Sequence, residues 1–225
     1  MVASQAVSSS AVEDYVKAVY RVEEEQGTAA TTSELAAQLH VTASSASAMV
    51  KRLAMQGLVT HEPYRGVQLT GPGRRLALRV VRRHRLVELF LVESLGLSWD
   101  QVHDEAEVLE HAVSPRLEAA IAARLGNPDR DPHGDPIPTA EGSLPQEHAE
   151  RLAGLPAGSS GVLVRVSDTD PTKLRYLAAQ QIALGDRIEV VERQPFGGSL
   201  SVRVNGDLHA VGAELAAAMR VRVDQ

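Results

Sequence analysis

The sequence contains no cysteine, which excludes disulfide bonds and thiolate metal ligands. Neither a cysteine-bound zinc finger nor a cysteine-bound iron–sulfur cluster can form in such a chain, whereas a metal site of carboxylates and imidazoles can. Aromatic residues are scarce as well, at 3% of the chain, which is too few for the base-stacking platform of a single-strand-binding protein.

Long hydrophobic runs are also missing. No run approaches the length of a membrane span, and the first ten residues are small and polar, without the apolar core of a secretory signal. We therefore expect a cytoplasmic protein without a membrane partner. The net charge of −6 argues against nucleic-acid binding through bulk charge, although arginines cluster between Arg74 and Arg85.

Apolar residues are plentiful enough for real cores, because 44% of the 225 residues are hydrophobic, and the length allows one large or two small domains. Valines and tyrosines recur at helical spacing over residues 11–26, and Gly27 is a helix stop. Asp14 falls in the first turn of this predicted helix, where a carboxylate interacts favourably with the helix N-terminus.

A helix-turn-helix pattern follows. Capping residues at 31–34 precede a short amphipathic helix (34–39), a tight connection, and a second helix that begins at Thr42 or Ala43 and ends at Gly57. The second helix opens with serines, whose hydroxyls can approach base edges and phosphates. The pattern predicts binding to double-stranded DNA, and the alternative is a winged helix that binds protein.

Two short strands, at 58–62 and 67–69, flank the turn Pro63–Gly66 and predict a wing whose tip could contact a minor groove or phosphate. The predicted DNA contacts are small hydroxyl and basic side chains: Thr42, Ser44, Ser45, Ser47, Lys51, Arg52 and Arg65.

The stretch Val102–Ala112 carries the clearest chemistry. No residue in it breaks a helix, and Ser98 and Asp100 offer capping groups for a start near Trp99. Two imidazoles and two carboxylates on one face would repel or desolvate badly unless they shared a cation. Four such residues stand at offsets 0, 4, 7 and 8, which is one helical face: His103, Glu107, Glu110 and His111.

The preceding predicted helix, about residues 72–95, carries a second face of this kind, because His84 and Glu88 stand four residues apart. Two consecutive helices with such faces can surround a metal ion, and mixed nitrogen and oxygen donors suit a first-row divalent metal. The alternative is a purely structural dimer whose histidines and glutamates are solvated. Metal binding is favoured, because chance seldom places both faces together.

The helix at 72–95 is apolar on more than one side, so we expect it to pack on its own domain and on a second copy of the chain. Together with the helix at 102–112 and a third helix from Ser114 to Leu125, it forms the expected dimer core. A two-fold dimer would match a palindromic operator.

Proline, glycine and aspartate are frequent in residues 126–160, which predicts a partly ordered linker with solvated His133 and His148. A helix at 172–180, a helical turn at 212–219 and turns at Gly197-Gly198 and Asn205-Gly206 separate short strands beyond it, and these predict a small, partly open β-barrel. The predicted strands are 162–166, 187–192, 200–204 and 220–223.

Taken together, these residues resemble the diphtheria toxin repressor family of metal-activated transcription factors over essentially the whole chain. The likeness is strongest in four places: His84-Arg85-Leu86 with Glu88, Val102–Ala106, Glu110-His111, and Gly134–Pro138. The resemblance implies a mainly α fold with a small β component. Its expected domains are a winged helix-turn-helix DNA-binding domain (1–73), a helical metal-binding and dimerisation domain (74–140), a linker (141–160) and an SH3-like β-barrel (161–225).

The resemblance also implies two metal sites. His84, Glu88 and His103 match the family's ancillary site, and the primary, activating site is matched by the set Asp14, Glu107, Glu110 and His111. The iron-sensing branch has a methionine at the position of Asp14 and a cysteine at that of Glu107. The manganese-sensing branch has carboxylates there and shares the sequences Glu13-Asp14-Tyr15 and Tyr64-Arg65-Gly66. Oxygen ligands in place of sulfur harden the site and favour Mn²⁺, with Fe²⁺ and other divalent first-row metals as alternatives.

Two departures qualify this match. Compact manganese regulators lack the C-terminal domain and carry a glutamate where Lys17 stands. In longer members the C-terminal domain lends a glutamate and a glutamine to the ancillary site, and the nearest matches are Asp170 and Lys173, of which only the aspartate can be a ligand.

The function implied is a manganese-activated repressor that binds palindromic operator DNA as a homodimer and controls manganese uptake and homeostasis genes. The first alternative is an Fe(II)-dependent repressor of iron uptake genes. A metal-dependent hydrolase is disfavoured, because no nucleophile is placed and nearly every site carboxylate is used as a ligand. We therefore expect neither enzymatic activity nor an organic small-molecule substrate.

Overall fold

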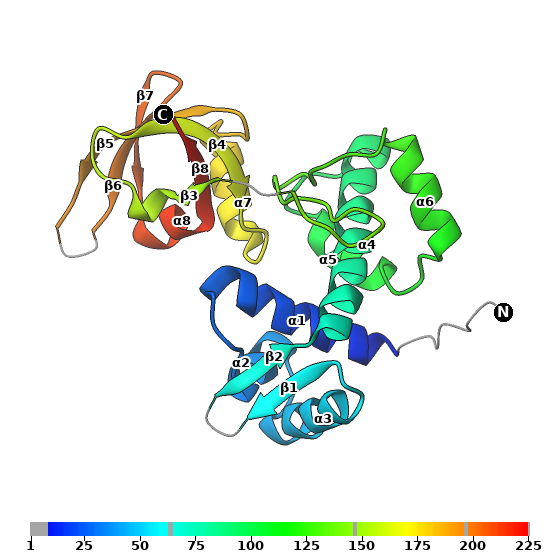
Figure 1. The fold of residues 1–225 in the computed structure, drawn as a ribbon. Helices are drawn as coiled ribbons and strands as arrows, with labels where there is room; N and C mark the ends of the chain where they lie inside the picture. Colours follow the sequence, from blue (N-terminus) through cyan, green and yellow to red (C-terminus); the bar gives the residue numbers. More distant parts are fainter. Residues whose placement is uncertain (1–8, 63–64, 146–147, 196–197, 225) are drawn as a thin grey trace. The chain divides into compact units, whose positions relative to one another are not determined.

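A computed structural model of the chain describes residues 9–62, 65–145, 148–195 and 198–224, and Figure 1 labels its helices and strands. The chain divides into two compact units, of which the first contains residues 1–83 and 138–143 and the second residues 84–137 and 144–225. Among the described residues, no helix combines the length and the apolarity needed to cross a membrane.

The first unit begins with three capped helices. Gly27 ends the first of them in the left-handed conformation (φ 69°), as the sequence predicts. Thr31 and Glu34 form a capping box at the start of the second, and the Thr42 hydroxyl accepts a hydrogen bond from the Ser45 N–H at the start of the third. These helices are α1 (Ser10–Gln26), α2 (Thr32–Gln38) and α3 (Ala43–Met55).

An antiparallel hairpin completes the winged helix of this unit. It consists of β1 (Val59–Glu62) and β2 (Gly66–Leu69), with Val59 opposite Leu69. Two residues of the predicted wing turn, Pro63 and Tyr64, lie outside the described residues. The hairpin leads directly into α4 (Gly71–Leu95), whose first half belongs to this unit. The core is aliphatic, with Val16, Val19, Leu35, Val50, Leu53 and Val67 fully buried.

In the second unit, α4 packs against two apolar clusters, which agrees with its being apolar on more than one side. Leu86 and Leu89 lie in one cluster with Ile121, and Val87 and Leu91 lie in the other. Most of the remaining residues lie on the helices α5 (Val102–Leu109) and α6 (Pro115–Arg124), and Val113 and Ile137 lie outside them. The Ser114 hydroxyl caps α6 as predicted. Leu95, Val108 and Leu117 stay exposed on these helices.

The predicted bounds of α5 were wrong at both ends. The helix begins at Val102 rather than near Trp99, and it ends at Leu109 rather than at Ala112. Neither Ser98 nor Asp100 caps it, because residues 98–101 form a turn closed by a bond from the Gln101 N–H to the Ser98 carbonyl (2.9 Å). The Ser98 hydroxyl instead bonds Asp100 and, with Arg175, lowers the pKa of that carboxyl.

The prediction of a partly ordered linker was wrong for residues 131–138, most of which are buried. Ile137 belongs to the apolar cluster formed with α4 and α6, and an isolated bridge joins Arg130 and Pro136. Further along, Leu152 and Leu155 are buried in the core of the C-terminal sheet. The loop-like composition of residues 126–160 therefore did not predict that Ile137, Leu152 and Leu155 are buried in hydrophobic cores.

The C-terminal part of this unit is one antiparallel six-stranded sheet in the order β3-β8-β4-β5-β6-β7 (Figure 1). Its two edge strands, β3 and β7, do not pair with each other, so the predicted barrel is not closed. The strands are β3 (Glu150–Arg151), β4 (Ser160–Val166), β5 (Arg187–Arg193), β6 (Leu200–Val204), β7 (Asp207–Val211) and β8 (Met219–Val223).

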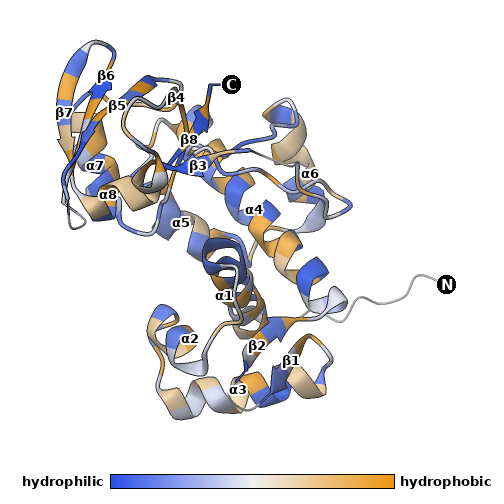
Figure 2. Ribbon diagram, turned by 60° about the vertical axis from the view of Figure 1, so that its left-hand side comes forward, coloured by the Kyte–Doolittle hydropathy of each residue, from blue (hydrophilic) through white to orange (hydrophobic). Residues whose placement is uncertain are grey.

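A core of sixteen buried residues, among them Leu163, Ile188 and Val202, lies on one face of the sheet. Figure 2 shows hydrophobic and hydrophilic residues interspersed along these strands, as in a sheet with one buried face. The short helical elements are η1 (Leu152–Gly154), α7 (Pro171–Ala179) and α8 (Ala213–Ala218). The predicted turn Asn205-Gly206 joins β6 to β7 with both residues at positive φ (52° and 102°). The other predicted turn includes Gly197, which lies outside the described residues.

Candidate metal centre

α4 presents the first two donors on one buried face. His84 and Glu88 stand one turn apart, and the distance from His84 Nε2 to Glu88 Oε1 is 3.0 Å. Leu86 and Val87, which lie between them in the sequence, are buried in the two apolar clusters, and His84 is itself buried. Glu88 is fully buried, which is rare for a glutamate unless it is paired.

α5 brings a second imidazole to the same point. His103 Nδ1 lies 3.2 Å from His84 Nε2 and 3.3 Å from Glu88 Oε1, and the two rings meet edge to face. Two ring nitrogens can lie this close only when at least one carries a proton or both face a cation. The predicted convergence of the two helical faces is therefore present for His84, Glu88 and His103.

The C-terminal domain supplies a fourth donor that the sequence did not reveal. Asp168 Oδ2 lies 2.9 Å from His103 Nδ1. Asp170, the predicted contributor, instead caps α7 by accepting a hydrogen bond from the Thr172 N–H (2.9 Å), and it also lies 3.8 Å from Lys173. We call His84, Glu88, His103 and Asp168 the buried cluster, because their ligand atoms can all lie within 4.8 Å of one another.

The electrostatics of the buried cluster favour ionised Glu88. Burial acts to raise the pKa of this carboxyl, but the charge of His84 and hydrogen bonds from His103 and His84 outweigh it and hold the pKa below its usual range. Glu88 Oε2 is nevertheless buried without a hydrogen-bond partner among the described residues. An orphaned carboxylate oxygen is costly, and a cation would satisfy it.

A buried histidine lies behind Glu88, although it was predicted to be solvated. His133 is fully buried, with Nε2 2.6 Å from the Trp99 carbonyl oxygen and Nδ1 3.8 Å from Glu88 Oε1. Its Nδ1 also lacks a hydrogen-bond partner in the described part of the chain, and its ring stacks on the Trp99 indole at 6.3 Å. The prediction failed because it rested on the polar composition of the surrounding segment. His148, in contrast, is exposed as predicted.

Asp131 extends this group, since Glu88, Asp131 and His133 could also offer ligand atoms to one ion. Burial raises the pKa of Asp131 well above its usual range, and the charges of Asp135 and Glu88 raise it further, against the lowering effect of Arg85.

The remaining predicted donors of this unit lie on α5 and just beyond it, and we call Glu107, Glu110 and His111 the α5 donor set. Glu110 is fully buried, and its carboxylate lies 2.6 Å from His84 Nδ1 and 3.6 Å from His111 Nε2. Glu107 is more exposed and lies 3.5 Å from His103 Nε2. His84 thus contacts Glu88 and His103, the other helical members of the buried cluster, through Nε2, and it contacts Glu110 of the α5 donor set through Nδ1. Asp14, the fourth predicted member of the primary site, is half buried on α1 of the first unit.

These residues fit a divalent cation. The donors are imidazole nitrogens and carboxylate oxygens, and the chain has no thiolate to offer. Within the described ranges, Glu88 Oε2 in the cluster and His133 Nδ1 beside it have no hydrogen-bond partner. A set of this composition accepts Mn²⁺, Fe²⁺ and related first-row ions.

The predicted DNA-binding residues lie on or next to α3 and the wing. All of those on α3 are exposed. The hydroxyls of Ser44 and Ser45 each also lie 2.9 Å from the Thr42 hydroxyl at the helix start. Thr42 therefore has a capping role whatever else it contacts. At the wing, Arg65 is exposed and pairs with Glu62 at 3.4 Å.

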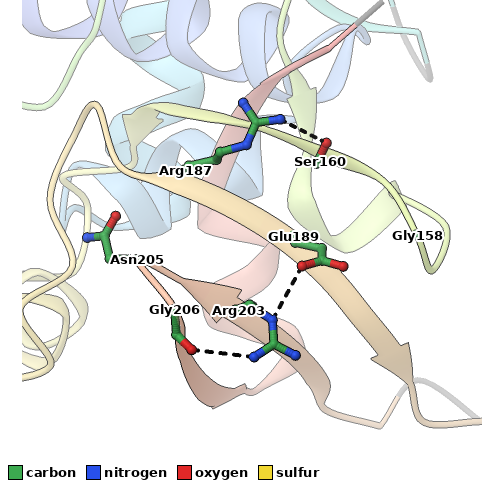
Figure 3. A pocket seen from close by; sticks show the side chains of 7 residues that line it. All are labelled: Gly158, Ser160, Arg187, Glu189, Arg203, Asn205 and Gly206. Carbon is green, nitrogen blue, oxygen red and sulfur yellow. Dashed lines mark hydrogen bonds and ion pairs between the residues drawn. The ribbon is translucent and has the colours of Figure 1, made fainter.

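A polar hollow of about 460 Å³ on the C-terminal sheet lacks the features of a metal or anion site (Figure 3). The Arg187 guanidinium there bonds Ser160 and Asp224, and Arg203 pairs with Glu189 at 3.4 Å. The positive charges that line the hollow are therefore already neutralised.

A winged helix, a buried nitrogen–oxygen cluster and a small C-terminal sheet are the features of a metal-dependent DNA-binding regulator, and known proteins agree. Residues 8–67 match the family model of the iron-dependent repressor N-terminal DNA-binding domain. Residues 70–139 match its metal-binding and dimerisation domain, and residues 150–223 match the FeoA domain.

Individual relatives cover from two thirds of the chain to nearly all of it. The diphtheria toxin repressor of Corynebacterium efficiens is 32% identical over 93% of this chain and 94% of its own. The iron-dependent repressor IdeR of Mycobacterium tuberculosis is 37% identical over 68% of this chain and 69% of its own. A solved manganese-dependent transcriptional repressor in complex with manganese is 47% identical over 95% of this chain and 100% of its own, with a TM-score of 0.91.

The chain belongs to the family of iron-dependent and diphtheria toxin repressors, whose members are metal-dependent transcriptional repressors and not enzymes. The predicted family and the predicted class of protein are thereby confirmed. Relatives named for iron and for manganese both occur.

Proposed function

We propose that this chain is a manganese-activated repressor that works in the cytoplasm as a homodimer on palindromic operator DNA and controls manganese uptake and homeostasis genes. One observation carries the proposal: the buried donors are all nitrogen and oxygen, in a chain without cysteine. Carboxylate-rich sites of this kind suit Mn²⁺ better than sulfur-containing ones do. The 47% identity to a manganese-dependent repressor supports the same choice.

Two metal sites are assigned. The proposed activating site consists of Asp14, Glu107, Glu110 and His111, in which Asp14 follows from the family resemblance. The proposed ancillary site is the buried cluster, in which Asp168 takes the place of Asp170 because of its 2.9 Å approach to His103. We also keep the expected boundaries of the DNA-binding domain (1–73) and of the metal-binding and dimerisation domain (74–140). The expected linker (141–160) and SH3-like domain (161–225) are revised so that the C-terminal domain begins at Glu150, because β3, η1 and the buried Leu152 and Leu155 belong to its sheet and core.

A divalent cation supplies positive charge that offsets the repulsion among the clustered carboxylates. The chain's own residues do the rest. Asp14 lies on α1, in the same unit as α3, so a tie between Asp14 and the α5 donor set would fix the position of the recognition helix. The exposed apolar side chains Leu95, Val108 and Leu117 are the proposed contacts with the second copy. Ser47, Lys51, Arg52 and Arg65 are the proposed DNA contacts, along with the hydroxyls near Thr42.

The test is operator binding measured at one fixed low salt concentration with Mn²⁺, with Fe²⁺ under anaerobic conditions, and with chelator, because salt alone shifts DNA affinity strongly. We expect tight binding with Mn²⁺ and weak binding with chelator. Asp14→Ala should lose the response, whereas Glu105→Ala, an exposed acid on α5, should keep it. A normal Mn²⁺ response in the Asp14→Ala protein would refute the assignment of the activating site.

The iron-dependent alternative has its own support, since a relative 37% identical is named an iron-dependent repressor. Replacing oxygen by sulfur donors separates the two possibilities. The double variant Asp14→Met/Glu107→Cys should shift the preference of DNA binding from Mn²⁺ toward Fe²⁺, because softer donors disfavour Mn²⁺. An unchanged metal preference would show that the carboxylates do not set it.

A further inference from the structure

The segment Asp131–Pro136, which we call the clamp loop, is closed by its own first side chain. Asp131 Oδ1 accepts hydrogen bonds from the backbone N–H of His133 (2.8 Å) and of Asp135 (2.9 Å). The Asp131 N–H in turn donates to the Asp135 carbonyl (3.0 Å). These bonds give a short loop of fixed shape inside the second unit.

The clamp loop is joined to β4 by its backbone. The His133 carbonyl accepts a hydrogen bond from the Val166 N–H (2.9 Å). Gly134 passes so near to β4 that a Cβ atom there would lie 2.0 Å from the Val164 carbonyl oxygen. The loop and the end of β4 are therefore in direct contact, with no space for a side chain between them.

The Asp135 carboxylate connects this contact to α4. Its Oδ1 lies 2.9 Å from a guanidinium nitrogen of Arg85, on α4, and 2.6 Å from one of Arg165, on β4. The Arg85 guanidinium also donates to the Pro136 carbonyl (2.5 Å). Asp135 is only 5% exposed, so both positive charges pair with one desolvated carboxylate, and Arg85 also lies 3.5 Å from the Asp131 carboxylate.

We propose that Asp135 is a positioning residue for the buried cluster: by bridging Arg85 and Arg165 it holds the end of β4 on α4 and thereby keeps Asp168 against His103. Asp168 follows β4 directly, two residues after Val166, so its place depends on where that strand ends. This inference rests on the proposed role of the buried cluster as a metal site.

The physical reason is the balance of charge. Without the Asp135 carboxylate, Arg85 would keep its pair with Asp131, but Arg165 would lie near the Arg85 guanidinium with no carboxylate joining the two, and moving β4 away would relieve the repulsion. Groups that orient a ligand in this way control metal affinity although they never contact the ion.

The experiment uses the full chain with Arg165→Gln as the deciding variant, because this change leaves the Asp135–Arg85 pair intact and spares the fold. Asp135→Asn is the second variant. Asp224→Asn is the matched control, since Asp224 also binds an arginine, Arg187, on the same domain but is exposed. Two quantities are measured: Mn²⁺ affinity by calorimetry, and amide hydrogen exchange of Val166 in the absence of metal.

The Arg165→Gln and Asp135→Asn proteins should bind Mn²⁺ at the buried cluster at least about tenfold more weakly than the wild type, and their affinity at the activating site should be unchanged. Their Val166 amide should exchange faster. Asp224→Asn should match the wild type in both measurements. Unchanged exchange and unchanged affinity in Arg165→Gln would overturn the proposal. A third variant, Asp168→Asn, tests separately whether the buried cluster is a metal site. If it is not, the Asp168→Asn protein will bind Mn²⁺ like the wild type. The Val166 exchange rate will still decide whether Asp135 and Arg165 hold β4.

Discussion

The buried cluster and the α5 donor set meet at α5, which carries His103 of the first and Glu107 of the second, but they differ in how closely their donors are assembled. In the buried cluster, His84, Glu88, His103 and Asp168 approach one another to 2.9–3.3 Å. In the α5 donor set, the His111–Glu110 distance is 3.6 Å and the Glu107 side chain is 38% exposed.

This difference indicates different roles. Donors that the packing of the chain holds close together cost little to organise around an ion, and they suit a site that stabilises the fold. The α5 donor set combines the fully buried Glu110 with the partly exposed His111 and Glu107, so closing this set around an ion can change the positions of other elements. We infer that the α5 donor set is the one whose occupancy controls DNA binding, and three variants test this distinction.

The largest expected effect is on the packing behind the buried cluster. Gly134→Ala should destabilise the second unit by about 3 kcal/mol, because the new Cβ atom would collide with the Val164 carbonyl at a left-handed φ of 85°. Gly126→Ala, in the same unit, is the control. Gly126 has a similar φ of 77° with nothing within 4 Å of the added atom, so only the backbone strain of about 1–2 kcal/mol should appear. Denaturant unfolding of the metal-free proteins measures both, and equal losses would contradict the close approach of the loop to β4.

A second variant acts where the two sets meet. Glu110→Gln keeps the shape but removes the charge next to both His84 and His111, so the metal-dependent gain in DNA affinity, about 5–150-fold for typical coupling, should vanish. DNA titrations with Mn²⁺ and with chelator provide the measurement. Glu105→Gln serves as the control. A Glu110→Gln protein that still responds fully would show that the α5 donor set does not control DNA binding.

The smallest effect on regulation is expected from Asp168→Asn. Loss of this carboxylate should weaken Mn²⁺ binding at the buried cluster by about 10–100-fold, by analogy with the loss of groups that support a site. DNA binding at saturating Mn²⁺ should change little, because the α5 donor set is untouched. Calorimetry together with DNA titration decides, and a complete loss of the DNA response would mean that the buried cluster is the controlling site.

Much of this organisation could be predicted from local sequence. Capping residues and periodicity gave α1, α2, α3 and α6 nearly to the residue, because such signals act within one turn. The spacing of His84 and Glu88 and the histidine at 103 gave three of the four donors of the buried cluster, since a helix repeats its face every three or four residues.

The rest depends on contacts between segments distant in sequence. Asp168 lies sixty-five positions after His103, and only the path of β4 decides that it, rather than Asp170, reaches the imidazole. His133 is buried because the clamp loop packs against Trp99 and β4, which its polar composition does not reveal. Strand β7 was missed for a related reason: Leu208 is exposed on this edge strand, so the sequence lacks the alternation of a half-buried strand.

The indole stacked on His133 has a practical consequence. Trp99 is the sole tryptophan of the chain, and its carbonyl oxygen and ring both contact this histidine, whose other nitrogen faces Glu88. Excitation at the red edge of the protein absorption band therefore excites only Trp99, which lies next to the buried cluster. The protein carries its own optical probe, so metal binding at the proposed site should change the tryptophan emission of the unlabelled chain.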